Sequence, residues 1–263
     1  MKNYAEILEA YDKGRYHIAP FRKASPSFVA GNFTDLSYSA GTPIANYYAS
    51  SPMVFTTLNG NEGIFKGVGV DKLLHKITIH DNSANATFYN LLDYVLYAPF
   101  VDFDSTDEQL FTTIPLPRYD GKGLQVMLVI QGTGTGTANI TMNYTNENGV
   151  SGRTSTTLIN SALNAGTLAS QGQQGYLNLM KGDNGIRSIE SVTMSSAIGG
   201  IGAIVIVKPL ASIQKYELSP IEKDFLIDKQ SLPFIHKDAY LNFVAKSVGS
   251  ATVVTQGQLE FIY

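Results

Sequence analysis

The sequence predicts an all-β protein: a jelly-roll-like β-sandwich with a short N-terminal helix and an extended N-terminal arm. Gly, Thr, Ser and Asn supply much of the polar composition, and these residues favour turns and strands over helices. Many short segments alternate apolar and polar residues, as strands with one buried face do. Turn signals separate these segments at intervals of roughly ten residues, which is typical of sandwiches and barrels. The pattern does not fix the order of the strands.

Length and composition limit the possible classes further. The 263 residues can bury a sizeable core, as one large β domain or two small ones. We divide the chain into an N-terminal helix and extended arm, residues 1–52, and a β-sandwich body, residues 53–263. Charged residues make up only 16% and the net charge is −3, so no basic surface is expected to attract nucleic acid. A surface with so little charge suits contacts with other protein subunits.

The sequence shows no pattern of export or membrane insertion. Residues 1–16 lack the apolar core and cleavage site of a signal peptide, and no apolar run reaches the roughly 18 residues of a membrane span. The chain contains no cysteine, which excludes disulfides and cysteine-based metal sites. We therefore expect a soluble protein that is made in a cytoplasm and does not bind membranes.

The first predicted element is a short amphipathic helix that ends before Gly14. Tyr4, Ile7, Leu8 and Tyr11 follow helical spacing within it. A helix of this length does not persist in water without docking. Its apolar stripe must therefore contact either this chain's own body or another subunit.

The next segment, residues 15–52, combines prolines with small and aromatic residues. Prolines interrupt regular pairing, whereas aromatic side chains carry too much apolar area to remain in water. Two interpretations are open: a long loop that covers its own sandwich, or an arm that docks on a neighbouring subunit. For the second, the candidate partner-binding residues of helix and arm are Tyr4, Ile7, Leu8, Tyr11, Phe21, Phe28, Phe33, Tyr38, Tyr47 and Tyr48.

The body contains most of the predicted strands. They fall within 54–58, 73–80, 87–101, 125–158, 176–180, 186–208, 239–246, 252–255 and 259–263. Residues 125–158 predict a three-stranded meander, and residues 189–208 repeat its motif of strand, glycine-rich turn and strand. Residues 161–175, rich in Gly, Ala, Ser and Gln, predict an exposed loop. The capping-box pattern at residues 219–222 predicts a short helix at 220–227.

Two stretches could bind ligands. A nucleotide-binding loop needs a helix after its glycines, whereas the glycine run at 132–136 precedes an alternating segment, which favours a hairpin tip. Asp102, Asp104, Asp107 and Glu108 could ligate calcium or supply a carboxylate pair for glycoside hydrolysis. They lack the glycine and the distal glutamate of an EF-hand loop, which favours a solvated acidic loop.

The remaining candidates favour structural roles. His17, His75, His80 and His236 are scattered, and His75 and His80 fall on opposite faces of one predicted strand. No nucleophile elbow, zinc-protease motif or P-loop occurs. Exposed tyrosines could stack on sugars, but the absence of tryptophan disfavours such a platform. We therefore expect no enzyme, with no catalytic residues, no cofactor and no metal site.

Structural phrases are spread along most of the chain. They are Thr34-Asp35-Leu36-Ser37, Gly41-Thr42-Pro43, Tyr47-Tyr48, DYVLYAPFVDF at 93–103, Asp107-Glu108-Gln109, Leu116-Pro117-Arg118-Tyr119, YTNENGVSGR at 144–153, GDNGIRSIESVTM at 182–194, VIVKPLA at 205–211 and DAYLNF at 238–243. Together they resemble a family of tailed-bacteriophage virion structural proteins, capsid auxiliary or decoration proteins among them. The resemblance implies a component of the virion that is made in the host cytoplasm. It transfers no functional residues.

Three functions follow from this resemblance. The first is a capsid decoration (cement) protein, which binds the major capsid protein as a homo-oligomer, expected to be a trimer, and stabilises the head through contacts between subunits. The second is a structural protein of the neck, tail or baseplate. The third is a glycan- or receptor-binding module of the virion. The chain lacks the long spine helix of an HK97-type major capsid protein and the repetitive shaft of a long fibre.

Overall fold

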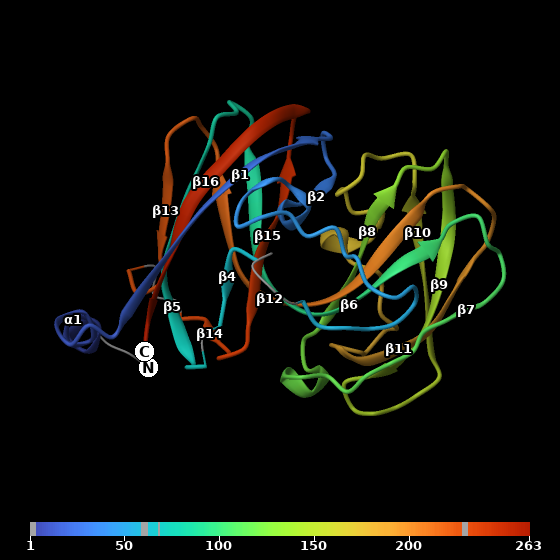
Figure 1. Cartoon of the computed structure of the whole chain (residues 1–263), viewed down its shortest axis with the longest axis horizontal. Helices are drawn as coiled ribbons and strands as arrows, with labels where there is room; N and C mark the ends of the chain where they lie inside the picture. The colour runs from blue at the N-terminus through green and yellow to red at the C-terminus, as the bar shows by residue number, and fades with distance from the viewer. Residues whose placement is uncertain (1–3, 59–62, 68, 228–230) are drawn as a thin grey trace.

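The computed structural model describes residues 4–58, 63–67, 69–227 and 231–263. It confirms the all-β class, with a short N-terminal helix and curled antiparallel sheets in a sandwich-like arrangement (Figure 1). The helix, α1 (Tyr4–Asp12), forms where the helical spacing predicts it. No helix among the described residues is long and apolar enough to cross a bilayer.

Three sheets make up the fold, and each is named here by its position. The terminal sheet has the order β13 (Ile221–Asp224), β5 (Lys72–Asp81), β16 (Ala251–Ile262), β1 (Tyr16–Phe28) and β3 (Gly41–Thr42), with β14 (Phe234–Ile235) also paired to β5. The central sheet has the order β2 (Phe33–Asp35), β15 (Tyr240–Ser247), β6 (Thr87–Asp102), β12 (Ile201–Lys215) and β8 (Gln125–Gly132), with β4 (Phe65–Lys66) also paired to β15. The distal sheet has the order β10 (Arg153–Asn160), β9 (Thr137–Asn146), β11 (Ile186–Met194) and β7 (Gln109–Leu110).

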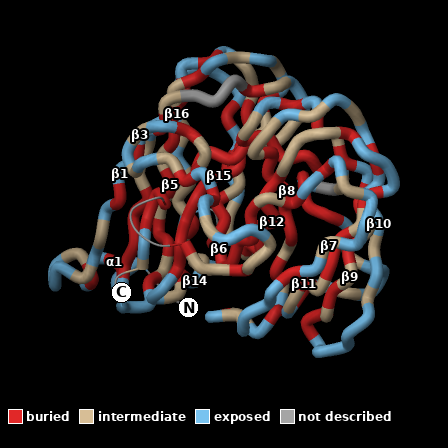
Figure 2. The backbone as a smooth tube through the Cα atoms, turned by 45° about the vertical axis from the view of Figure 1, so that its right-hand side comes forward, coloured by how far each residue is buried: buried red, intermediate tan, exposed pale blue. Residues whose placement is uncertain are grey.

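The long strands β6 and β12 join two sandwiches into one body. They pair antiparallel from Ile201↔Asp102 to Lys215↔Thr87. One half of this pair packs on the terminal sheet through residues such as Leu91. The other half packs on the distal sheet through residues such as Val95. Figure 2 shows buried residues gathered along these strands and exposed residues along the outer loops. Because β6 is buried on both faces over most of its length, its sequence is apolar without alternation.

Loops cover the second face of the central sheet. Tyr48 and Leu58 from one loop, and Leu168 and Tyr176 from another, form a third core with residues of β6, β8 and β12. Residues 161–175 were expected to form an exposed loop. Instead, the bridge Val129↔Leu168 ties this segment to the central sheet, and much of it is buried.

The N-terminal region shares the core of the sandwich. β1 lies between β16 and β3 in the terminal sheet, and β2 pairs with β15 in the central sheet. Lys23 is buried and donates from Nζ to the Pro43 carbonyl oxygen at 2.8 Å, which fixes the loop after β3. The interpretation as a loop is wrong for Tyr16–Phe28, which form β1 within the terminal sheet, and residues 43–52 lie against this chain's own sandwich through Tyr48. Residues 1–52 therefore do not form a part separate from residues 53–263.

The two glycine-rich turns connect facing sheets and are not hairpin tips. β8 belongs to the central sheet and β9 to the distal sheet, and the same holds for β12 and β11. The turns meet: a Cβ atom on Gly134 would lie 1.9 Å from the Gly199 carbonyl oxygen, and Thr135 N donates to Ile198 O at 2.8 Å. The glycines are needed because two backbones touch here.

The predicted helix at 220–227 is absent. Residues Ile221–Asp224 instead form β13, which pairs with β5, and Phe225 is buried in the core between the terminal and central sheets. The Asp224 carboxylate accepts hydrogen bonds from the backbone of Leu226 and Ile227, so it ends the strand in a turn. Pairing with an open sheet edge outweighs a capping signal of four residues.

Candidate binding surfaces

Four of the ten candidate partner-binding residues lie in the core of this chain. Ile7, Phe21, Phe28 and Tyr48 have exposed fractions of 2%, 4%, 1% and 0%. Ile7 packs with Ala10 and Ile262, which docks α1 on the end of β16. These four side chains offer no surface to another subunit.

The other six candidates lie at or near the surface. Phe33, Tyr11 and Tyr38 are half-buried, and the edge of Tyr38 contacts Tyr47 at 5.1 Å between ring centroids. Tyr47, Tyr4 and Leu8 are exposed. Three of these six residues lie on α1, two lie in the segment 36–52 that follows β2, and Phe33 lies on β2 at the edge of the central sheet. They therefore do not form one site.

An apolar strip, which we call the N-terminal strip, runs along α1 onto β1. Tyr4, Leu8 and Tyr11 share one side of the helix, and Tyr11 stacks on Tyr16 at 4.9 Å between ring centroids. Ile18 follows Tyr16 on the outer face of the terminal sheet. Tyr4 is 64% exposed, Leu8 is 49% exposed, and Tyr16 and Ile18 are each 42% exposed.

Charged side chains border this strip. Lys76 Nζ lies 3.3 Å from Glu222 and 3.7 Å from Glu260, on the same face of the terminal sheet. Lys13 and Glu9 form an exposed ion pair on the helix. An apolar centre with a charged border is the usual composition of an interface between proteins.

The group of side chains that most resembles a catalytic site lies beside this strip. His75 Nε2 is 3.4 Å from Asp224 Oδ2, and His75 Nδ1 is 3.5 Å from the Tyr11 hydroxyl. That hydroxyl donates to Glu260 at 3.1 Å. Burial and the negative charge of Glu260 raise the pKa of Tyr11 to about 12, so the phenol stays protonated at neutral pH. A protonated tyrosine supplies neither a nucleophile nor a base, and the cluster joins α1 to the terminal sheet.

The carboxylates of the acidic loop accept hydrogen bonds from other groups of this chain. Asp102 accepts from the backbone of Asp104, Asp104 from that of Gly199, and Glu108 from the Ser191 hydroxyl at 2.5 Å. Among the described residues, no group of three or more His, Asp or Glu side chains could hold a metal ion. These carboxylates thus order a loop at the end of β6.

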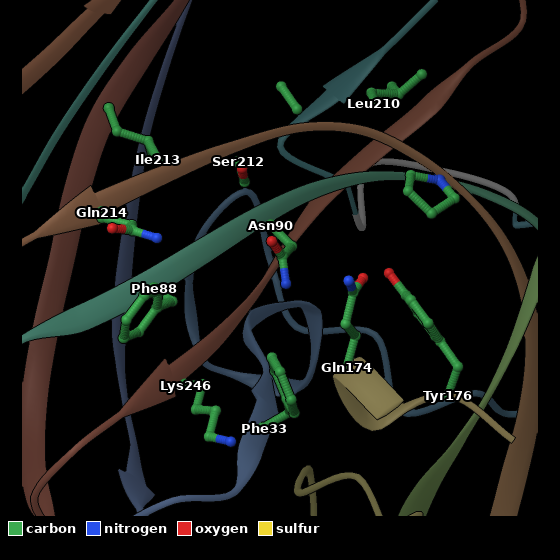
Figure 3. A pocket seen from close by; sticks show the side chains of 12 residues that line it. Phe33, Phe88, Asn90, Gln174, Tyr176, Leu210, Ser212, Ile213, Gln214 and Lys246 are labelled. Carbon is green, nitrogen blue, oxygen red and sulfur yellow. The ribbon is translucent and has the colours of Figure 1, made fainter. Parts of the chain in front are cut away.

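A groove of about 570 Å³ lies on the part of the central sheet that the loops do not cover (Figure 3). Its floor consists of residues from β6 and β12, including Asn90 and Ser212, and one end is closed by Gln174 and Tyr176. In Figure 3, Phe88 and Lys246 lie on the side away from Tyr176, and Phe33 lies between Lys246 and Gln174. Lys246 Nζ lies 5.1 Å from the centre of the Phe33 ring, a cation–π contact.

A strained turn holds Gln174 above this groove. Gln174 has a φ of 55°, in the left-handed region, and Gly175 has a φ of 80°. A Cβ atom on Gly175 would lie 2.7 Å from the Phe33 ring, so only glycine lets the turn close onto that ring. The groove residues come from β2, β6, β12, β15 and the turn before Tyr176. No motif in the sequence marks them, because the fold alone brings these segments together.

Comparison with known proteins leaves the family open. No protein-family model matches the chain, and no curated protein matches it. The chain is similar at 10% identity to a solved structure described as the infectious bursal disease virus VP2 subviral particle. That alignment covers 94% of this chain and 80% of the other, with a TM-score of 0.19, which is too low to support an argument about fold or function.

Proposed function

We propose that this chain is a structural protein of a tailed-bacteriophage virion, and that it is a capsid decoration protein without enzymatic activity. In this proposal it binds the major capsid protein from outside, as a homo-oligomer, and stabilises the head through contacts between subunits. The resemblance of its structural phrases to virion proteins supports the class. The observation that carries the docking surface is the N-terminal strip, an exposed apolar surface with a charged border.

The position of the strip suits attachment to a shell. Ile7 and Ala10 fix α1 on the body, so the exposed Tyr4 and Leu8 belong to a docked helix. A preorganised surface loses less conformational entropy on binding than a flexible arm does. Helix α1 and the C-terminal end of β16 lie at this end of the molecule, and the distal sheet lies at the other end (Figure 1). Binding through the strip would therefore leave the distal half directed away from the shell.

Substitution of the strip tests the docking surface. Burial of a large apolar side chain contributes about 1.5–3 kcal/mol, so the double variant Tyr4→Ser/Leu8→Ser should bind heads at least about tenfold more weakly. The measurement is co-sedimentation of purified protein with heads that lack it. The matched control is Leu110→Ser/Val150→Ser, which removes exposed apolar side chains of the distal half. Both variants should keep the melting temperature of the original chain. Full occupancy by the Tyr4/Leu8 variant would exclude the strip as the docking surface.

Electron microscopy of the complete particle tests where in the virion the protein lies. A decoration protein occupies regular positions over the whole icosahedral shell. Copies confined to one vertex or to the tail would instead support the neck, tail or baseplate alternative, and absence from the particle would contradict the virion role.

A further inference from the structure

We propose that the groove on the central sheet binds a saccharide unit that carries a carboxylate, as in acidic cell-surface polysaccharides. This site is separate from the N-terminal strip and does not depend on where the protein sits in a virion. The groove combines the three kinds of group that such a ligand requires: aromatic rings, uncommitted amides and hydroxyls, and one cation.

The polar side chains of the groove are available for a ligand. Within the described part of the chain, the side chains of Asn90, Gln174, Ser212 and Tyr176 make no hydrogen bond with other protein groups, although Tyr176 is only 8% exposed. An amide both donates and accepts, so two amides and two hydroxyls can match the ring of hydroxyl groups on a sugar. In Figure 3, Asn90 lies across the groove from Gln174 and Tyr176, so these groups can reach one bound molecule from two sides.

Aromatic rings supply the apolar part of the site. Phe33 and Phe88 are half-buried along one side, and Tyr176 closes the other. The C–H faces of a pyranose pack on such rings while its hydroxyls remain free for the amides. A volume of about 570 Å³ falls in the range of small-molecule sites and exceeds the space of a single ion.

The charge of the groove selects an anionic ligand. Of the described residues that line it, Lys246 alone is charged and none is acidic. Among the residues that the structure describes, Lys246 forms no ion pair; its ammonium is held over the Phe33 ring. A carboxylate on the sugar would complete a charge-assisted hydrogen bond with this ammonium.

An extended peptide fits the groove less well. Peptides that add to sheets bind an open strand edge through backbone hydrogen bonds. β6 is already paired with β12 on one side and β15 on the other. In the described chain the second edge of β12 is open at residues 209–214, because β8 pairs only with residues 201–207, but Pro209 offers no backbone donor there. The side chains of the groove that make no hydrogen bond within the described chain therefore favour a ligand that is rich in hydroxyl groups.

The test is ligand-observed NMR titration of the full chain with methyl β-D-glucuronide, methyl β-D-glucoside and sodium acetate. We expect saturable binding of the glucuronide, binding of the glucoside about tenfold weaker, and no competition by acetate at equal concentration. Lys246→Gln should lower glucuronide affinity to that of the glucoside, and Asn90→Ala should weaken both sugars. Lys66→Gln is the matched control, because Lys66 also lies over an aromatic ring, that of Tyr240, outside this groove.

The outcomes separate the components of the proposal. Absence of saturable sugar binding would overturn it, and so would glucuronide binding that Lys246→Gln leaves unchanged. Equal affinity for glucoside and glucuronide would overturn the acidic ligand, and effective competition by acetate would overturn the saccharide. If Asn90→Ala fails to fold, Lys246→Gln still decides, because its side chain is half-exposed and forms no ion pair among the described residues.

Discussion

Single buried carboxylates connect segments that are distant in the sequence. Asp93 on β6 accepts from Arg118 Nε at 2.7 Å and Nη2 at 2.5 Å, from the Tyr119 hydroxyl at 2.8 Å and from Tyr240 N at 2.7 Å. The Asp93 side chain is fully buried and that of Arg118 is 4% exposed. A charge in this position is stable only while its partner is present, since the interior solvates it poorly.

Loss of Arg118 should therefore destabilise the fold strongly. Arg118→Ala leaves Asp93 buried without a counter-charge, so the free energy of unfolding should fall by about 3–5 kcal/mol, as measured by urea denaturation. Lys13→Ala provides the control, because its ion pair with Glu9 is exposed and should change stability by less than about 1 kcal/mol. Equal stability of the two variants would show that the contact between Arg118 and Asp93 does not stabilise the fold.

These residues lie within the structural phrases that are spread along the sequence. Asp93, Arg118 and Tyr240 belong to three of the phrases, at 93–103, 116–119 and 238–243, and they meet in one cluster. A second cluster forms in the same way: burial raises the pKa of Asp35, which accepts from the hydroxyls of Tyr48 and Tyr94. The sequence shows such residues as polar interruptions of apolar runs. Their partners cannot be read from it, because they depend on how distant strands align.

At the scale of elements, the turn at residues 181–185 is fixed to the β9–β10 hairpin through Asp183. Arg153 binds both carboxylate oxygens, at 2.9 and 3.0 Å, and the Tyr144 hydroxyl and Asn146 donate to them as well. The hydrogen bonds from Arg153, followed by those from Tyr144 and Asn146, lower the pKa of Asp183 to about 2 against the opposing effect of burial.

This pKa predicts a loss of stability in acid. In the unfolded chain an aspartate titrates near pH 3.9, so the folded state favours the carboxylate. The contribution is fully present above about pH 4 and is lost as the pH falls toward about 2. The stability advantage of the original chain over Asp183→Asn should therefore shrink between pH 5 and pH 2 in denaturation series. Arg153→Met should reduce this pH dependence as well, because it removes the main cause of the low pKa of Asp183. Parallel curves of stability against pH for all three proteins would contradict the role given to Asp183.

Elements with long apolar or alternating runs were predictable, and those decided by tertiary pairing were not. The N-terminal helix and the long strands of the body follow from local periodicity, whereas the strands predicted at 54–58 and 176–180 form only isolated bridges. β13 does not, because the local capping signal is opposed by the open edge of β5. The glycine turns were identified as turns, but the sequence does not say whether the two flanking strands share a sheet. The N-terminal strip and the groove could not be predicted, because each combines residues from segments that only the fold brings together. Of the ten candidate residues, only Tyr4, Leu8, Tyr11 and Phe33 contribute to these two surfaces.

At the scale of the whole molecule, two sandwiches share the central sheet, and the N-terminal region completes one of them. β1 separates β16 from β3, and Phe21 and Phe28 lie in the core between the terminal and central sheets. Removal of residues 1–50 would expose the long edge of β16 and open this core. Removal of residues 1–14 would delete only α1 and uncover Ile262 at the end of β16.

The two truncations should therefore behave differently. The chain from residue 15 should unfold cooperatively, with a lower melting temperature than the original, and keep the near-ultraviolet circular dichroism of its buried tyrosines. The chain from residue 51 should lose both the cooperative transition and that signal, because it lacks β1, which pairs along β16, and Asp35, which accepts from the Tyr94 hydroxyl. A cooperative transition in the shorter chain would show that residues 51–263 fold alone. In that case the N-terminal region would be an arm that covers an already stable body.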